Sequence, residues 1–238
     1  MRIVTYNIRG GLGMDDQRST ARVAATVRAH RPDVVCFQEV HQRLPWSHMI
    51  DQPRELKRLL GMPVTFHRVL RLGMSAYGVA VASPLPVMGK KEHLLPSVKE
   101  QRGALEVRLD TPGIGPVTIF CTHWGLGEDE RARQAVALAE AVNAAPGPVV
   151  VCGDFNERAD ARGVQTLLSM TGLRDADASA DRPTFPSGSA ARARIDFVLH
   201  SADLAASEVS VDAASLASDH HLVRADLVPT VAREGGAL

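Results

Sequence analysis

The chain has no net charge and few aromatic side chains. Lys and Arg together number 27, as do Asp and Glu, so the formal charge of the 238 residues is zero. This balance gives no sign of a cationic surface for long nucleic-acid tracts. Two Trp, two Tyr and six Phe are few for a platform that stacks the bases of single strands. Nucleic acid therefore stays open as a partner but is not favoured.

Cysteine pairs, long apolar runs and linkers are also missing. Cys36, Cys121 and Cys152 each lie inside an apolar run, without the close spacing of zinc or redox motifs, and are typical of small buried hydrophobes. No run is long enough to span a bilayer, and no basic leader with a cleavage site precedes the first strand-like segment. We therefore expect a soluble, cytoplasmic protein without stable membrane insertion. We expect a monomer with one domain over 1–228 and an unstructured tail over 229–238.

The apolar pattern predicts strands and helices throughout the chain. The expected helices are a segment capped by Ser19 or Thr20 that ends before Pro32, and the segments 53–60, 128–143 and 161–170. Short strands between 63 and 122 are separated by prolines and glycines and are spaced like an antiparallel meander. Other expected strands cover 2–8, 33–40, 194–200 and 207–212, and one more runs from Pro148 until Gly153 releases the chain. Residues 218–227 lead from a loop into a final strand.

The same order of predicted secondary-structure elements occurs twice in the chain. In each instance a strand, a loop and a helix lead to a proline-headed strand, PDVVCFQE in the first part and PVVVCGD in the second. Polar residues close both of these strands. The echo indicates two similar units that pack together with their strand ends facing a shared cleft.

Polar side chains suited to metal and phosphate follow the apolar strands. Each alone has a plain structural explanation, such as a cap, a turn or a solvated carboxylate. Together they favour chemistry, because chance would not concentrate them at strand ends. Carboxylates and amides without a cysteine pair are the ligands of Mg²⁺ or Mn²⁺ rather than zinc. The set comprises Asn7, Glu39, His123, Asp154, Asn156, Asp196, Asp219 and His220.

Seven short motifs in order resemble the endonuclease/exonuclease/phosphatase (DNase I-like) superfamily. They are TYN at 5–7, QE at 38–39, YGVAVASPLPV at 77–87, THWG at 122–125, GDFN at 153–156, RIDFVL at 194–199 and SDH at 218–220. The segment PTFPSG before RIDFVL is similar to the compact bacterial metal-dependent hydrolases of this superfamily. The resemblance implies an α/β (α+β) fold, a four-layered sandwich of two packed, mostly antiparallel β-sheets flanked by helices.

The resemblance also implies a metal site. Glu39 matches the principal ligand, Asn7 matches a second metal-site motif, and Asp219 matches a further carboxylate near the metal. The expected ion is Mg²⁺ or Mn²⁺. Arg102, in QRGAL, is either a contact to the substrate phosphate or a plain surface arginine. Tyr77 and Trp124 either line the pocket or pack in the core.

The catalytic roles are likewise implied by the resemblance. Asp154 matches the residue that positions or deprotonates the attacking water, and Asn156 matches the one that holds a phosphate oxygen. His123 matches a histidine that contacts the phosphoryl group or assists the leaving oxygen. His220 matches a histidine oriented by a carboxylate, here Asp196, and a carboxylate so placed raises the imidazole pKa. The expected reaction is in-line attack of an Asp-activated water on a phosphoester.

The superfamily does not determine the substrate. Ala193 stands where DNA-repair members often have tryptophan, and with the composition this favours a small or lipid-derived phosphodiester or phosphomonoester. A DNA endonuclease or exonuclease, including the AP-site type, is the alternative, and a non-catalytic binding module of the same fold is a weaker one. A basic tract, formed by residues 54–58 and 67–71, is either a solvated face or a surface that attracts an anionic substrate.

Overall fold

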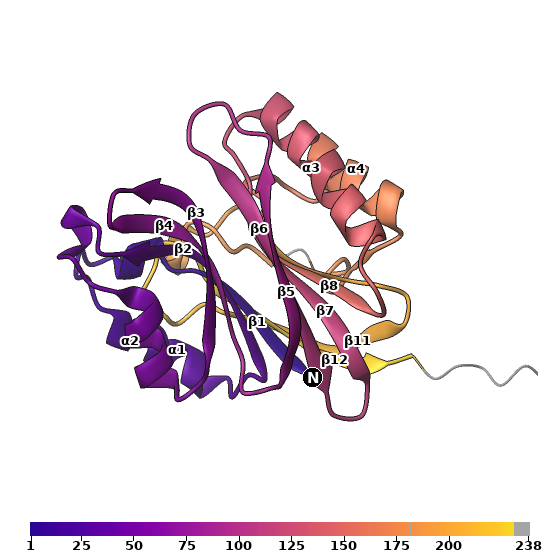
Figure 1. Ribbon diagram of the computed structural model, residues 1–238, viewed down its shortest axis with the longest axis horizontal. Helices are drawn as coiled ribbons and strands as arrows, with labels where there is room; N and C mark the ends of the chain where they lie inside the picture. Colours follow the sequence, from indigo (N-terminus) through magenta and orange to yellow (C-terminus); the bar gives the residue numbers. More distant parts are fainter. Residues whose placement is uncertain (181, 231–238) are drawn as a thin grey trace, which may run out of the picture.

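Two β-sheets lie face to face in the computed structural model, which describes residues 1–180 and 182–230 (Figure 1). The first sheet contains β1 (Arg2–Asn7), β2 (Val34–Gln42), β3 (Val64–Leu72), β4 (Ser75–Ala82), β11 (Leu204–Asp212) and β12 (Leu222–Pro229). The second contains β5 (Val87–Leu95), β6 (Arg102–Thr111), β7 (Gly115–His123), β8 (Val149–Asp154), β9 (Arg174–Asp175) and β10 (Asp196–His200). The strand orders are β11-β12-β1-β2-β4-β3 and β5-β6-β7-β8-β10-β9.

Helices cover the outer face of each sheet. α1 (Thr20–Ala29) and α2 (Gln52–Leu60) lie on one side in Figure 1, and α3 (Glu128–Asn143) and α4 (Arg162–Thr171) on the other. Val23, Val27 and Leu56 pack on the first sheet, while α3 and α4 pack on Phe120 and Val151 of the second. The four-layered α/β sandwich predicted from the sequence is confirmed.

The two sheets repeat one arrangement. Among the described residues, four of the five neighbouring strand pairs in each sheet are antiparallel, so the mostly antiparallel prediction is confirmed. The parallel pairs are β1 with β2 and β7 with β8, and the chain crosses between their strands through α1 and α3. The doubled order of elements in the sequence thus corresponds to two similar halves.

Aliphatic side chains from both sheets fill the space between them. Ile3 and Val34 of the first sheet meet Ile119 and Val198 of the second in one buried cluster. The three cysteines are free and fully buried, as their apolar neighbours predicted. Burial of such aliphatic surface stabilises the fold by about 25 cal/mol per Å², so the packed faces hold the strand ends in register.

Two predictions about the strands were wrong. The segment from 63 to 122 is not one meander, because β3 and β4 join the first sheet and β5, β6 and β7 the second. The crossing lies at Pro84 and Pro86, which lack the N–H groups that a continuous ladder requires. The tail was also placed too early: β12 includes Pro229, and the Thr230 N–H donates to the Asp203 carbonyl. Residues 231–238 of that expected tail lie outside the described residues.

None of the described helices is both long enough and apolar enough to cross a bilayer.

Candidate functional site

One polar pocket of about 620 Å³ opens where the strands of both halves end. β1 ends at Asn7, and β7 and β8 end side by side at His123 and Asp154, which are paired in the parallel register. Asn7 and Asp196 are each 1 % exposed and lie behind the pocket, in contact with residues that line it. The lining includes Glu39, Arg102, His123, Asp154, Asn156, Asp219 and His220. The structure therefore brings together Arg102 and the eight polar residues that the sequence placed at strand ends.

Asp154 is the centre of this arrangement. Its Oδ2 accepts a hydrogen bond of 2.9 Å from Asn7 Nδ2, and its Oδ1 accepts one of 2.9 Å from the Asn156 backbone N–H. His123 Nε2 and His220 Nε2 lie 3.4 and 3.6 Å from Oδ2. Burial raises the pKa of Asp154 to about 7, against the opposing charge of His220. The carboxyl group is thus held in place and tuned toward proton exchange near neutral pH.

His220 is held by the carboxylate that the sequence predicted. Its Nδ1 lies 2.9 Å from Asp196 Oδ2, and the Asp196 backbone N–H donates to Thr184 Oγ1 at 3.3 Å. Burial alone would lower the pKa of His220, but attraction to Asp196 and Asp154 raises it to about 10. The ring is therefore an imidazolium at neutral pH, with Nε2 directed at Asp154.

Glu39 does not stand at a strand end as expected but on a bulge within β2. The register of the β2–β4 pair shifts between Phe37 and Val40, and Glu39 has the left-handed φ of 54°. Few residues other than glycine adopt this conformation, and bulges of this kind often redirect a functional side chain. Here the bulge brings Glu39 Oε1 to 3.1 Å from Asn7 Nδ2.

The residues around Glu39 fit a hard divalent cation. Desolvation raises the pKa of Glu39 and outweighs the hydrogen bond from Asn7 and the charge of His220, so a cation at this carboxylate would stabilise its charged form. Asp219 offers a second carboxylate, which is 3.3 Å from Arg9 Nε. Asn7 directs its Nδ2 group at Glu39, and its Oδ1 accepts a hydrogen bond of 3.0 Å from the Arg9 backbone N–H. Carboxylate oxygens such as those of Glu39 and Asp219 suit Mg²⁺ or Mn²⁺.

A second cluster of potential metal ligands, two aspartates and a histidine, lies in the same site. Asp154, Asp196 and His220 place one ligand atom each within 4.8 Å of one another. However, His220 Nδ1 is already bonded to Asp196, and a protonated imidazole offers no lone pair to a metal. The oxygen donors around Glu39 therefore fit a cation better.

Hydrogen-bond donors surround His123. Arg102 Nη1 lies 2.9 Å and the Tyr77 hydroxyl 3.2 Å from its Nδ1, and Asn156 Nδ2 lies 3.1 Å from its Nε2. Burial, and then the charges of Arg102 and His220, lower the pKa of His123 well below its ordinary value. His123 is thus neutral beside a charged His220, which separates the roles available to the two rings.

The structure decides between the alternatives that the sequence left open for Arg102, Tyr77 and Trp124. Arg102 is 8 % exposed and lines the pocket, so the alternative of a plain surface arginine is wrong. Tyr77 also lines the pocket. Trp124 is fully buried and packs on Phe155, with ring centroids 4.6 Å apart, so it belongs to the core.

Sequence reasoning missed several residues of the lining. Arg9 and His41 lie two positions beyond Asn7 and Glu39 and line the pocket. Arg9 begins a 3-10 turn and Glu39 lies on a bulge, both with left-handed φ, so the two-residue period of an extended strand does not account for these placements. The local sequence likewise carried no signal for Trp46 and Arg18, which also line the pocket.

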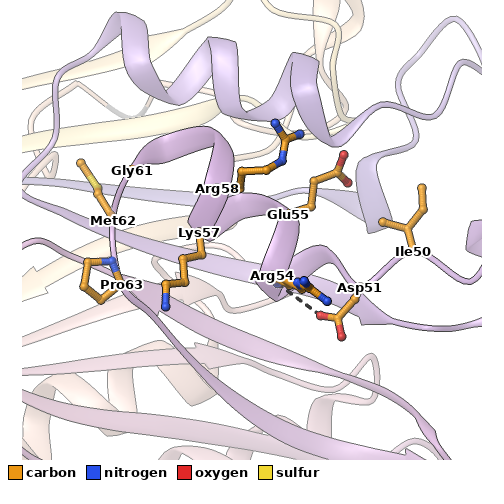
Figure 2. A pocket seen from close by; sticks show the side chains of 9 residues that line it. All are labelled: Ile50, Asp51, Arg54, Glu55, Lys57, Arg58, Gly61, Met62 and Pro63. Atoms are coloured by element: carbon orange, nitrogen blue, oxygen red, sulfur yellow. Dashed lines mark hydrogen bonds between the residues drawn. The ribbon is translucent and has the colours of Figure 1, made fainter.

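The basic tract does not form one surface beside this pocket. Arg54, Lys57 and Arg58 line a separate groove of about 770 Å³ along α2, in which Lys57 and Arg58 point in different directions (Figure 2). His67 is instead buried, with Nδ1 3.2 Å from Glu92. The tract is therefore divided between two parts of the fold, and the buried His67 departs from the expectation of a solvated face.

Comparisons with known proteins agree with this architecture. A sequence profile described as the Endonuclease/Exonuclease/phosphatase family matches residues 4–220. The uncharacterized protein YbhP of Escherichia coli K12 is 31 % identical over 170 residues, which are 66 % of this chain and 66 % of that protein.

Solved structures show the same fold. The endonuclease/exonuclease/phosphatase from Beutenbergia cavernae is 25 % identical, with a TM-score of 0.82 over 96 % of this chain and 71 % of that one. A mannosyl-6-phosphatase from Bacteroides thetaiotaomicron has a TM-score of 0.80 at 20 % identity, over 96 % of this chain and 99 % of its own. At that identity the second likeness concerns the fold alone.

Proposed function

The chain belongs to the endonuclease/exonuclease/phosphatase family, and from this premise we propose that it is a divalent-metal-dependent phosphoester hydrolase. One observation carries the proposal: the Asp154 carboxyl group faces an open pocket, with Asn7 bonded to one oxygen and the His220–Asp196 pair behind it. Hydrolysis of a phosphoester requires a base for water, donors for the phosphoryl oxygens and a proton for the leaving oxygen.

Each requirement has a residue in the pocket. Asp154 accepts the proton of the attacking water, and its raised pKa favours that transfer near neutral pH. Asn156 and Arg102 donate to phosphoryl oxygens. His220, kept charged by Asp196, stabilises negative charge and supplies the proton for the leaving oxygen. His123 is neutral and orients the phosphoryl group through its contacts with Arg102 and Asn156.

A divalent cation completes the proposal. Glu39, Asn7 and Asp219 would hold Mg²⁺ or Mn²⁺, which when bound neutralises charge on the phosphoryl oxygens. The carboxylate oxygens of Glu39 and Asp219 and the raised pKa of the half-buried Glu39 support this assignment.

We propose a small or lipid-derived phosphodiester or phosphomonoester as substrate. The zero net charge supports this choice over long nucleic acid. A nuclease is the alternative, and a panel of abasic-site DNA, plasmid DNA, nucleotides, sugar phosphates and phospholipids under one metal condition decides between them. All the assigned residues come from one chain, which supports a monomer as the working unit.

Removal of the metal tests the proposal. The purified protein should release p-nitrophenol from bis(p-nitrophenyl) phosphate with Mg²⁺ or Mn²⁺, and EDTA should stop the reaction until excess metal restores it. Glu39→Gln should raise the metal concentration for half-maximal rate at least tenfold, whereas Glu55→Gln on α2 should not. Hydrolysis that persists after chelation would contradict the metal assignment, and no hydrolysis of any panel member would contradict the enzyme.

A further inference from the structure

Apolar side chains stand exposed around the mouth of the catalytic pocket. Trp46 is 59 % exposed, Leu72 is 47 % exposed and Leu126 is 76 % exposed, and all three line the pocket. Leu12 and Leu70 add half-buried aliphatic surface to the same lining. Exposed apolar surface gathered at a pocket marks a place where an apolar group binds.

The loop that carries Trp46 is built to present it. Leu44 and Ser47 on either side are fully buried, and the Leu44 carbonyl accepts hydrogen bonds from the backbone N–H groups of Ser47 and Met49. His48 and Met49 both have left-handed φ values, 56° and 58°. Backbone of this kind costs free energy and persists where the surroundings enforce it. The loop is thus anchored while its indole remains in solvent.

The two tryptophans of the chain differ sharply. Trp124 is fully buried in the core, whereas Trp46 contributes nothing to a core and leaves most of its surface in water. The three strongly exposed side chains come from separate segments: the loop before α2, the end of β3 and the loop before α3. Their convergence at one opening is therefore a property of the fold rather than of one apolar stretch.

We infer that Trp46, with Leu72 and Leu126, binds a hydrocarbon chain attached to the phosphoryl group of the substrate. The inference rests on the proposed hydrolase function and narrows its substrate class to amphiphilic phosphoesters. The occupant follows from the position of the surface, which is continuous with the pocket of Asp154 and His220. Aliphatic leucines line the same pocket as the indole, and they offer no hydrogen bonds to the polar edge of a nucleobase.

A series of p-nitrophenyl phosphodiesters tests the contact between Trp46 and the hydrocarbon chain of the substrate. Methyl, butyl and octyl p-nitrophenyl phosphate share one leaving group, so in each case water adds to phosphorus and the bond to p-nitrophenolate breaks. Below the critical micelle concentration, kcat/KM should rise about 30-fold from the methyl to the octyl ester. Trp46→Ala should reduce this ratio to about threefold, and Trp46→Phe should restore most of it. Met88→Ala, an exposed apolar residue of β5 outside the lining, should leave the ratio unchanged.

The outcomes separate the inference from the function on which it rests. Equal kcat/KM along the series, or an unchanged octyl-to-methyl ratio in Trp46→Ala, would overturn the inference while leaving the hydrolase intact. No hydrolysis of any ester would overturn the proposed function itself. The p-nitrophenyl ester of thymidine 5′-monophosphate completes the design, because a larger loss on this ester than on the octyl ester in Trp46→Ala would assign the surface to a base. A rise in rate that starts only above the critical micelle concentration would assign it to an aggregated lipid surface rather than to single chains.

Discussion

Hydrogen bonds from three different strands act on a few side chains in the pocket. Asn7 at the end of β1 donates to Asp154 at the end of β8, and Asp196 at the start of β10 bonds to His220. Because the partners are distant in sequence, the geometry depends on the packing of both sheets. The His220–Asp196 pair resembles other carboxylate–histidine pairs, in which the carboxylate fixes the tautomer and stabilises the charged ring.

Removal of the Asp196 charge tests this pair. We expect Asp196→Asn to lower kcat about 100-fold, because His220 loses its orientation and its charge stabilisation. Steady-state kinetics on bis(p-nitrophenyl) phosphate measure the effect. Asp226→Asn, a carboxylate of β12 outside the pocket lining, should keep kcat within about twofold. A rate for Asp196→Asn within twofold of the parent would show that the pair has no catalytic role.

The convergence of the polar strand-end residues was predictable from the sequence, but their geometry and the rest of the pocket lining were not. Asp154 and His123 could be identified because each directly follows a long apolar run, which marks a buried strand and its end. The bulge at Glu39 depends on how β2 pairs with β4, and that pairing leaves no local signal. Trp46 was missed for a related reason, since its exposure follows from the buried anchors on either side of it.

The elements themselves were found from their apolar periodicity. All four helices were expected within one or two residues of their observed bounds, since caps and prolines mark their ends. The sheet that each strand joins was harder to predict from the sequence. The sequence of a strand such as β5 does not say which sheet the strand joins, so only the prolines at 84 and 86 indicated a break.

An ion pair between Arg2 and Asp226 joins β1 to β12, and Arg224 of β12 also pairs with Asp226. Arg2 Nε and Nη2 bond to Asp226 at 2.8 and 2.9 Å, and Arg224 Nη2 bonds to it at 2.6 Å. The hydrogen bond from Arg2, then that from Arg224, lowers the pKa of Asp226 below its ordinary value of 3.8. A lowered folded-state pKa gives stability that is present above the unfolded-state pKa and is lost as the pH falls through the folded-state value.

Asp226→Asn should therefore reduce the free energy of unfolding by about 1 kcal/mol at neutral pH, a modest effect because the ion pair is partly exposed. The difference from the parent should shrink as the pH falls below about 4. Urea unfolding at neutral and acidic pH measures it. A difference independent of pH would mean that the carboxylate charge contributes nothing to the β1–β12 junction.

At the scale of the whole molecule, the two halves share one aliphatic core between the sheets. Strands of both sheets contribute to the same buried cluster, and the pocket takes residues from both. We propose on these grounds that the chain forms a single domain, which extends past the expected boundary at 228 to include Pro229 and Thr230. The halves would then be unable to unfold separately without exposing the inner face of the partner sheet.

Unfolding as a single unit is the expected consequence. Far-UV circular dichroism and tryptophan fluorescence should give coincident urea transitions, because Trp124 reports on the second half while the backbone signal reports on both. Two separated transitions would contradict the single domain.

The central claim is that the Asp154 carboxylate activates water for attack on a phosphoester, and Asp154→Asn tests it most directly. The amide keeps the shape of the side chain, so the thermal midpoint and circular dichroism should stay close to those of the parent. With saturating Mg²⁺ or Mn²⁺, the rate of bis(p-nitrophenyl) phosphate hydrolysis should fall at least 100-fold, the scale expected for loss of a general base. A folded Asp154→Asn protein that hydrolyses the ester at near the parent rate would show that Asp154 does not activate the attacking water.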